Sequence, residues 1–210
     1  LRRALEQTGK SHPESEFYAV ALYQVYGDGE FLSLPLLAAG AEPGPESSSS
    51  EGFWGARWNP PDWTHPEIEL REKPALALER ALAAEATRKT ESHFAKVEAR
   101  YFRVLVRLAK RLGKLAPGLL HTTGDFVCFL HDEAGGVDLA RETIPEEVFT
   151  RLFAIDVKHQ AEVASVERQP PDERAAFLVT RLGRYDGIGK AFGRARPATG
   201  VNAPCRCRRQ

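Results

Sequence analysis

The chain has 210 residues, of which 42% are hydrophobic and 28% are charged. These proportions are ordinary for a globular protein and argue against disorder along the whole chain. Basic and acidic residues number 29 each, so the protein carries no net charge that would attract it to nucleic acid or to a membrane. Its apolar runs are too short to cross a bilayer and its charged start does not resemble a signal peptide, so we expect a cytoplasmic location.

The chain is expected to begin with a helix over residues 1–10, followed by a β-hairpin. Phe17 to Tyr26 is rich in aromatic and branched side chains, which favour a strand. Gly27-Asp28-Gly29 is typical of a hairpin turn, and residues 30–37 then supply the return strand.

The next stretch changes from loop to helix. Residues 41–52 are rich in Pro, Gly and Ser and predict a mobile loop, and residues 53–58 favour a third strand. Between residues 74 and 115, apolar side chains recur every three or four positions, which predicts two helices. Thr90 is the expected cap of the second helix.

A second hairpin is expected next, with strands over residues 125–131 and 137–142. Thr143-Ile144-Pro145-Glu146 has the spacing of a capping box and predicts a helix after it. A further helix is expected over residues 171–182. The predicted fold class is therefore α+β, with an antiparallel sheet built from two hairpins and helices packed on one side of it.

The sequence predicts one α+β domain over residues 1–183 and a flexible basic tail over residues 184–210. The tail holds seven Lys and Arg residues and one acidic residue, Asp186. Its last residues include Cys205 and Cys207, in a run that resembles the opening of the zinc-binding SEC-C motif. Two thiolates do not complete a four-ligand zinc site, so no cofactor is expected unless the motif is completed elsewhere.

Several segments together resemble a known bacterial family. These are Phe17 to Ala19, the Arg-Trp-Asn-Pro-x-x-Trp segment over Arg57 to Trp63, the strand over Phe126 to Phe129, and the Pro-Glu-Glu-x-Phe helix start over Pro145 to Phe149. Their order resembles the family catalogued as domain of unknown function 4303. That resemblance implies an α+β fold and no established activity. It also suggests a role among the immunity and interaction proteins of bacterial conflict systems.

Residues 54–65 form the most unusual stretch, with three tryptophans among polar side chains. Trp and Arg dominate binding hot spots, so this segment is the candidate recognition surface. The competing interpretation is that at least two of the tryptophans fill the core, and the high average burial of Trp favours it. The candidate binding residues are Trp54, Arg57, Trp58, Asp62, Trp63 and His65.

The sequence contains few groups suited to catalysis or metal binding. His131, Asp132 and Glu133, together with His65, could form a hydrolase-like site only if they met in one cleft. Cys128 lies in an apolar run, where a thiol stays protonated, and its spacing from His131 puts the two side chains on opposite faces of a strand. The sequence has neither a zinc-protease motif nor a nucleophile elbow.

These observations predict a non-catalytic interaction module with a protein partner, and immunity proteins are one class of such modules. Two alternatives stay open. One is a hydrolase-like enzyme with a site around His65, His131 and Asp132. The other is weak, salt-dependent binding of nucleic acid by the basic tail, which the balanced net charge makes the least favoured.

Overall fold

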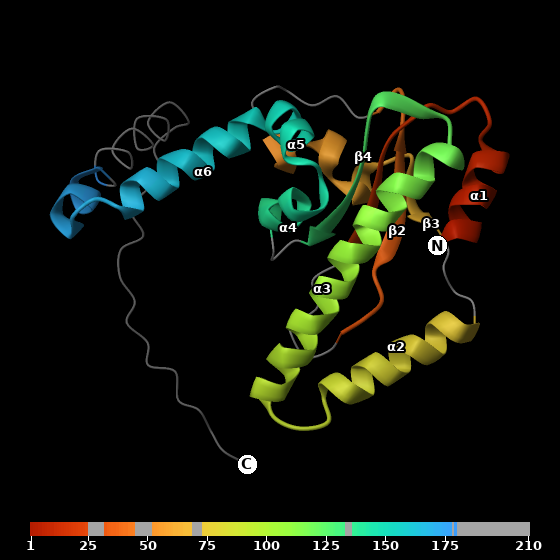
Figure 1. The fold of residues 1–210 in the computed structure, drawn as a ribbon, viewed down its shortest axis with the longest axis horizontal. Coiled ribbons are helices and arrows are strands. Elements are labelled where there is room, and N and C mark those ends of the chain that lie inside the picture. The colour runs from red at the N-terminus through yellow and green to blue at the C-terminus, as the bar shows by residue number, and fades with distance from the viewer. Residues whose placement is uncertain (25–31, 45–51, 69–72, 133–135, 178, 180–210) are drawn as a thin grey trace, which may run out of the picture. The chain divides into compact units, whose positions relative to one another are not determined.

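A computed structural model describes residues 1–24, 32–44, 52–68, 73–132, 136–177 and 179 of the chain. The chain divides into two compact units, Leu1–His159 and Gln160–Gln210. The first unit contains the sheet and every helix that packs against it (Figure 1).

The first unit is built on a four-stranded mixed sheet in the order β3-β2-β1-β4. The strands are β1 (Phe17–Gln24), β2 (Leu36–Ala41), β3 (His65–Ile68) and β4 (Thr122–Asp132). β2 pairs antiparallel with β1 and with β3, whereas β4 runs parallel to β1. Seven consecutive residues of β1 are buried, as expected for a strand covered on both faces.

The α+β class is confirmed, but the expected antiparallel sheet of two hairpins is partly wrong. β1 and β2 pair antiparallel as expected, whereas β4 pairs parallel with β1. Residues 137–142, expected as a strand, belong to helix α4 (Gly136–Thr143). Their apolar contacts explain why: Val137, Ala140 and Ile144 pack in one cluster at helical spacing of three and four. β4 therefore has no hairpin partner among the described residues and pairs with β1, after the chain has returned through two helices.

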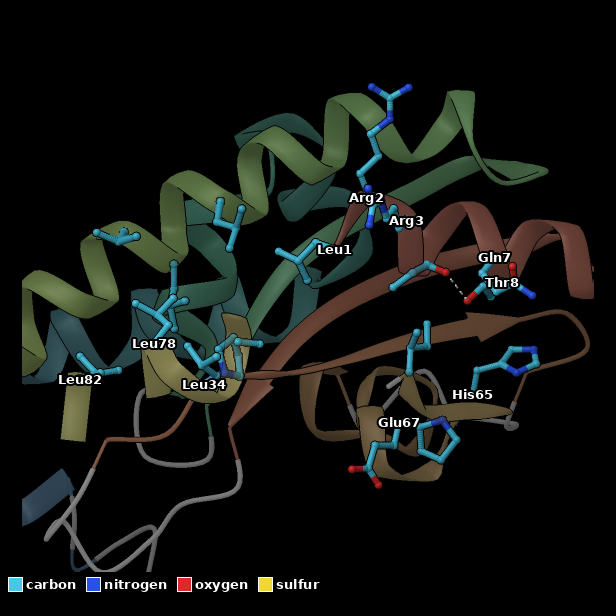
Figure 2. A pocket seen from close by; sticks show the side chains of 18 of the residues that line it. Leu1, Arg2, Arg3, Gln7, Thr8, Leu34, His65, Glu67, Leu78 and Leu82 are labelled. Carbon is cyan, nitrogen blue, oxygen red and sulfur yellow. Dashed lines mark hydrogen bonds between the residues drawn. The ribbon is translucent and has the colours of Figure 1, made fainter. Parts of the chain in front are cut away.

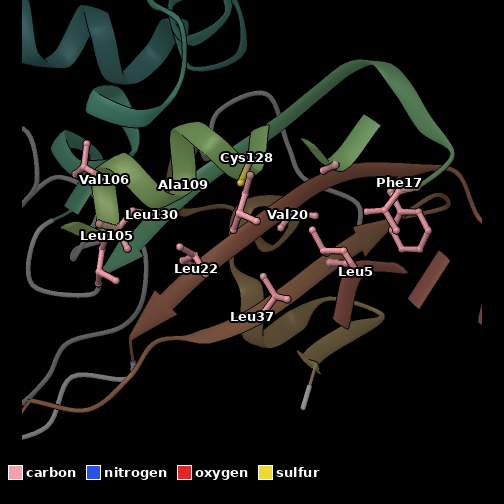
Figure 3. Packing of buried hydrophobic residues seen from close by; sticks show 14 of the residues in the cluster. Leu5, Phe17, Val20, Leu22, Leu37, Leu105, Val106, Ala109, Cys128 and Leu130 are labelled. Atoms are coloured by element: carbon pink, nitrogen blue, oxygen red, sulfur yellow. The ribbon is translucent and has the colours of Figure 1, made fainter. Parts of the chain in front are cut away.

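Helices cover both faces of the sheet, not one as expected. One face carries α1 (Arg2–Ser11), α2 (Lys73–Ala86) and α3 (Glu91–Leu115). Leu5 of α1 and Leu105 of α3 pack there over Val20, Leu22 and Leu130 of the strands (Figure 3). Burying each such Leu stabilises the fold by about 1.5–3 kcal/mol.

The opposite face is covered by shorter elements. These are the 3₁₀ turns η1 (Gly52–Trp54), η2 (Ala56–Trp58) and η3 (Pro60–Asp62), with α4 and α5 (Glu146–Leu152). Phe53, Trp58, Phe149 and Phe153 pack there around Phe129 of β4. Aromatic side chains thus dominate this second core.

The two long helices and their start signal are confirmed. α2 and α3 span most of residues 74–115, and the Thr90 hydroxyl accepts a hydrogen bond from the backbone N–H of His93. Tyr101, Leu105 and Leu112 form part of the buried stripe of α3. The helix at residues 1–10 is also confirmed, as α1.

Other boundaries differ from those expected. β2 begins at Leu36 instead of residue 30, and residues 53–58 form 3₁₀ turns instead of a strand. The expected capping residue Thr143 is the last residue of α4. Its hydroxyl lies 2.8 Å from the Ala140 carbonyl, so α5 begins without that cap. The turn at residues 27–29 and most of the 41–52 loop lie outside the described residues.

The second unit contains the end of α6 (Ala154–Glu167) and a helical segment over residues 171–177. The start of the expected helix at 171 is confirmed, whereas its end lies outside the described residues. Glu133 and the whole predicted tail, including Cys205 and Cys207, also lie outside the described residues. In the part of the chain that the structure describes, no helix is long and apolar enough to cross a membrane.

Candidate functional site

The tryptophan segment packs between the sheet and α5. Trp58 and Trp63 are buried, and both lie edge-on to the ring of Tyr18 on β1. Trp58 also contacts Phe153, with 4.9 Å between the ring centroids. The interpretation that at least two of the three tryptophans fill the core is therefore confirmed.

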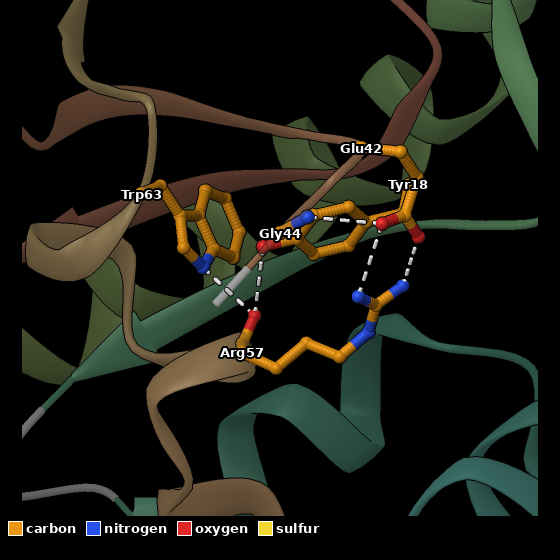
Figure 4. Close-up of polar contacts among 5 residues, drawn as sticks. All are labelled: Tyr18, Glu42, Gly44, Arg57 and Trp63. Carbon is orange, nitrogen blue, oxygen red and sulfur yellow. Dashed lines mark hydrogen bonds and ion pairs between the residues drawn. The ribbon is translucent and has the colours of Figure 1, made fainter. Parts of the chain in front are cut away.

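Arg57 holds this segment to the sheet through both its backbone and its side chain (Figure 4). Its carbonyl oxygen accepts hydrogen bonds from the Trp63 indole N–H, at 2.8 Å, and from the Tyr18 hydroxyl, at 3.1 Å. Its guanidinium lies over the Tyr18 ring, 4.1 Å from the centroid, and forms an ion pair with both oxygens of Glu42.

The charges of this cluster are tuned by their contacts. The hydrogen bond from Arg57 lowers the pKa of the Glu42 carboxyl, although partial burial opposes it. Burial raises the pKa of the Tyr18 hydroxyl to about 12, so it stays protonated and donates to Arg57. The arrangement fixes the segment in place and leaves little of the Arg57 side chain for a ligand.

Trp54 differs from the other two tryptophans because 56% of its surface is exposed. Its ring contacts Phe53 and His131 edge-on. The backbone N–H of Phe53 donates to the Asp156 carboxylate at 2.8 Å, which anchors this turn to the start of α6. Trp54 is thus an exposed aromatic side chain on a fixed backbone.

Asp62 and His65 each make contacts of their own. The Asp62 carboxylate accepts a hydrogen bond from the Asn59 amide at 2.7 Å. His65 is on the edge strand β3 and its ring lies 4.2 Å from that of His12, at the end of α1. Burial, and then the neighbouring His12, lower the pKa of His65. The six candidate binding residues therefore do not form one continuous surface.

The hydrolase alternative fails on geometry. Only 3% of the surface of His131 is exposed, and its ring stacks on Phe53 on the aromatic face of the sheet. His65 instead lies beside Phe17 and His12, on the α1 face. Since the sheet separates the two imidazoles, they do not meet in one cleft with Asp132.

The remaining reactive groups are buried. Burial lowers the pKa of His131 to about 4, and its Nδ1 has no hydrogen-bond partner among the described residues. Cys128 packs against α3, and burial raises its pKa to about 12. The two side chains lie on opposite faces of β4, as expected. Within the described residues, no three His, Cys, Asp or Glu side chains group as metal ligands.

A large groove lies on the helical face of the first unit, between α1, α2, α3 and β3. Its volume is about 1370 Å³, and most of its lining is apolar (Figure 2). Leu78 and Leu82 of α2 line one wall, and Val97, Val104 and Leu108 of α3 line another. His12, His65, Arg3, Glu67 and Arg100 supply polar groups along it.

The sequence does not predict this groove. The apolar stripes of α2 and α3 predict two helices but not how the helices lie relative to each other. In the structure the two helices form a V that opens toward α1 (Figure 1), so part of both stripes faces open space. The exposure of Leu78, at 59%, shows this most clearly.

Two curated proteins resemble part of the chain. An ATP phosphoribosyltransferase regulatory subunit of Cupriavidus necator is 36% identical over 119 residues, covering 45% of this chain and 30% of the relative. The protein of the same name from Cupriavidus taiwanensis is 35% identical with the same coverage. The chain thus spans less than a third of the length of these relatives.

Other comparisons give no match. No family model matches the chain. No solved structure matches it either. The resemblance to domain of unknown function 4303 thus has no support from a family model, and the similar proteins carry a different name.

These similarities correct the predicted function. The curated relatives are named as regulatory subunits of an ATP phosphoribosyltransferase and not as immunity proteins. The prediction of an immunity-type interaction module is therefore wrong. The absence of catalytic motifs, on which it was based, does not distinguish one class of non-catalytic protein from another. The hydrolase alternative fails on the geometry given above, and the basic tail of the nucleic-acid alternative lies outside the described residues.

Proposed function

We propose that this chain is a regulatory component that binds the catalytic subunit of an ATP phosphoribosyltransferase. The observation that carries the proposal is its identity of 36% and 35% with two regulatory subunits of that name. Because the chain covers 30% of those proteins, the proposal assigns it the binding role and not every activity of the relatives.

The structure offers features that suit a regulatory role. The acid–base side chains His65 and His131 are kept apart by the sheet, while one face carries an open apolar groove. Concave, mostly apolar surfaces are common binding sites. The proposal includes the protein partner expected from the sequence, since the catalytic subunit would be that partner. It also keeps the expected cytoplasmic location.

The test is complex formation with the ATP phosphoribosyltransferase catalytic subunit from the source organism. The two purified proteins are mixed at micromolar concentration and separated by size exclusion with light scattering. We expect a peak whose mass is the sum of both chains in a fixed ratio. An unrelated phosphoribosyltransferase is the control. Separate elution of the two proteins under all conditions would contradict the proposal.

A further inference from the structure

We propose that the groove between α1, α2, α3 and β3 binds an amphipathic helix with an acidic flank, supplied by the catalytic subunit. This inference rests on the proposed function and names the surface and the partner segment. The surface is inferred from the structure, because the names of the relatives specify no surface.

The shape of the groove favours a helix. Two of its walls are themselves helices, and their lining side chains recur at helical spacing, on α3 at Val97, Tyr101, Val104 and Leu108. Side chains arranged in such rows form ridges and grooves that receive the side chains of another helix. A third helix, α1, borders the same space. One added helix would therefore complete a packed bundle.

The size of the groove also favours a polypeptide segment. Pockets for small molecules usually have volumes of about 300–1000 Å³. The groove measures about 1370 Å³. A helix about 10 Å across would fill that volume with roughly three turns. Helix-in-groove binding uses anchors at that spacing and length.

The apolar surface inside the groove is accessible now. Leu78 is 59% exposed and Val104 is 44% exposed, although the α3 helix that carries Val104 buries another of its faces in the core. An exposed Leu alone needs no explanation. Two such side chains on facing walls of one groove provide the contacts that an apolar helix face would cover.

The charges along the groove indicate the polarity of its occupant. Glu85 is paired with Arg88 and close to His93, and Arg2 is paired with Glu6. Of the charged side chains that line the groove, Arg3, Arg100 and Glu67 form no ion pair among the described residues, so two guanidinium groups stand against one carboxylate in the lining. Glu79 of α2 acts electrostatically on Tyr101 but does not line the groove. Unpaired cations at the rim of an apolar site favour an acidic partner.

Arg100 and Val104 lie one turn apart on α3, and both line the groove. Residues four apart share one face of a helix. A bound helix that covers Val104 would thus place its flank near Arg100. This pairing of an apolar anchor with a neighbouring cation is the basis for an acidic flank on the apolar helix.

The experiment compares matched variants in binding to the purified catalytic subunit by calorimetry. Leu78→Asp places a charge in the groove, whereas Leu76→Asp alters a neighbouring residue of α2 that is 43% exposed and does not line it. Arg100→Glu is matched by Arg107→Glu, an exposed residue of α3 outside the groove. Thermal unfolding confirms that each variant is folded.

We expect Leu78→Asp to weaken binding by about tenfold or more, as for a central apolar anchor. Arg100→Glu should weaken it by about three- to tenfold and reduce its dependence on salt. Leu76→Asp and Arg107→Glu should bind like the wild type. Amides of α2 and α3 that line the groove should exchange hydrogen more slowly in the complex.

Two results overturn the inference and leave the proposed function standing. The first is wild-type binding that Leu78→Asp and Leu76→Asp change equally or leave unchanged. The second is a dimer of this chain alone that Leu78→Asp dissociates, since the occupant would then be a second copy. Failure of the wild type to bind the catalytic subunit overturns both the inference and the proposed function.

Discussion

The guanidinium of Arg57 lies over the ring of Tyr18, 4.1 Å from its centroid, and the backbone carbonyl of Arg57 accepts a hydrogen bond from the Tyr18 hydroxyl. One residue on a 3₁₀ turn thus contacts one strand residue through two different groups. Together with Trp63, this pair joins the irregular segment after β2 to the centre of the sheet.

Arg57→Ala should lower the free energy of unfolding by about 1–2 kcal/mol. The variant loses the cation–π contact and the ion pair with Glu42, both partly shielded from water. Urea unfolding provides the measurement. Arg151→Ala is the control, because its ion pair with Asp125 is more than half exposed and should contribute less than about 0.5 kcal/mol. Equal losses in the two variants would contradict the assigned role of Arg57.

Gly40→Ala should destabilise the sheet by about 1–3 kcal/mol, a typical cost of overpacking. A Cβ at position 40 would lie 2.5 Å from Cζ of Tyr18, which is held in place by Arg57. Gly124→Ala in β4 is the matched control, since a Cβ there meets nothing within 4 Å. Thermal unfolding of both variants compares them, and a Gly40→Ala protein as stable as Gly124→Ala would show that the Tyr18 ring can move away.

Trp54→Ala and Trp58→Ala should lower the free energy of unfolding by different amounts, because Trp54 is exposed and Trp58 is buried in the core. Trp58 is buried among Tyr18, Phe129 and Phe153, so its removal should cost about 3–5 kcal/mol. Trp54 is 56% exposed and should cost about 1 kcal/mol or less. Chemical unfolding measures both. A loss at Trp54 as large as that at Trp58 would mean that Trp54 is part of the core and not a candidate contact residue.

The buried imidazole of His131 predicts a loss of stability in weak acid. Its pKa is about 6.5 in the unfolded chain and about 4 in the folded one, because burial disfavours the charged form. Between these values only the unfolded chain binds the proton. The free energy of unfolding is therefore retained above pH 6.5 and falls as the pH drops toward 4, by at most about 1.4 kcal/mol per pH unit.

His131→Phe should reduce that pH dependence while keeping an aromatic ring against Phe53. The difference in unfolding free energy between wild type and variant, measured by urea at pH 7 and pH 5, isolates the contribution of His131 from that of the other histidines. His159→Phe, at an exposed position of α6, is the control. An unchanged difference between the two pH values in His131→Phe would mean that His131 is protonated as readily in the folded protein.

Local signals in the sequence predicted the elements that depend on local physics. The apolar run of β1 and the Thr90 cap of α3 are determined by neighbouring residues, and both are confirmed. The strand predicted over residues 137–142 was wrong because a short apolar segment after a turn fits a strand or a helix equally well. The contacts of Ala140 and Ile144 with the aromatic core decide for the helix.

The candidate site depended on relationships that one sequence does not show. The burial of Trp58 and Trp63 was expected from the size of their side chains. The parallel pairing of β4 with β1, the separation of His65 from His131 and the opening between α2 and α3 all depend on how distant segments pack. The groove depends on the placement of Leu78 of α2 and Val104 of α3 around one space.

The most direct test of the central claim is an activity titration. The catalytic subunit of the ATP phosphoribosyltransferase from the source organism is held at fixed concentration while this chain is added. Our account predicts a change in its rate that saturates at a fixed ratio of the two proteins and is weakened in Leu78→Asp but not in Leu76→Asp. A rate that stays constant at every concentration, with no complex formed, would contradict a regulatory role.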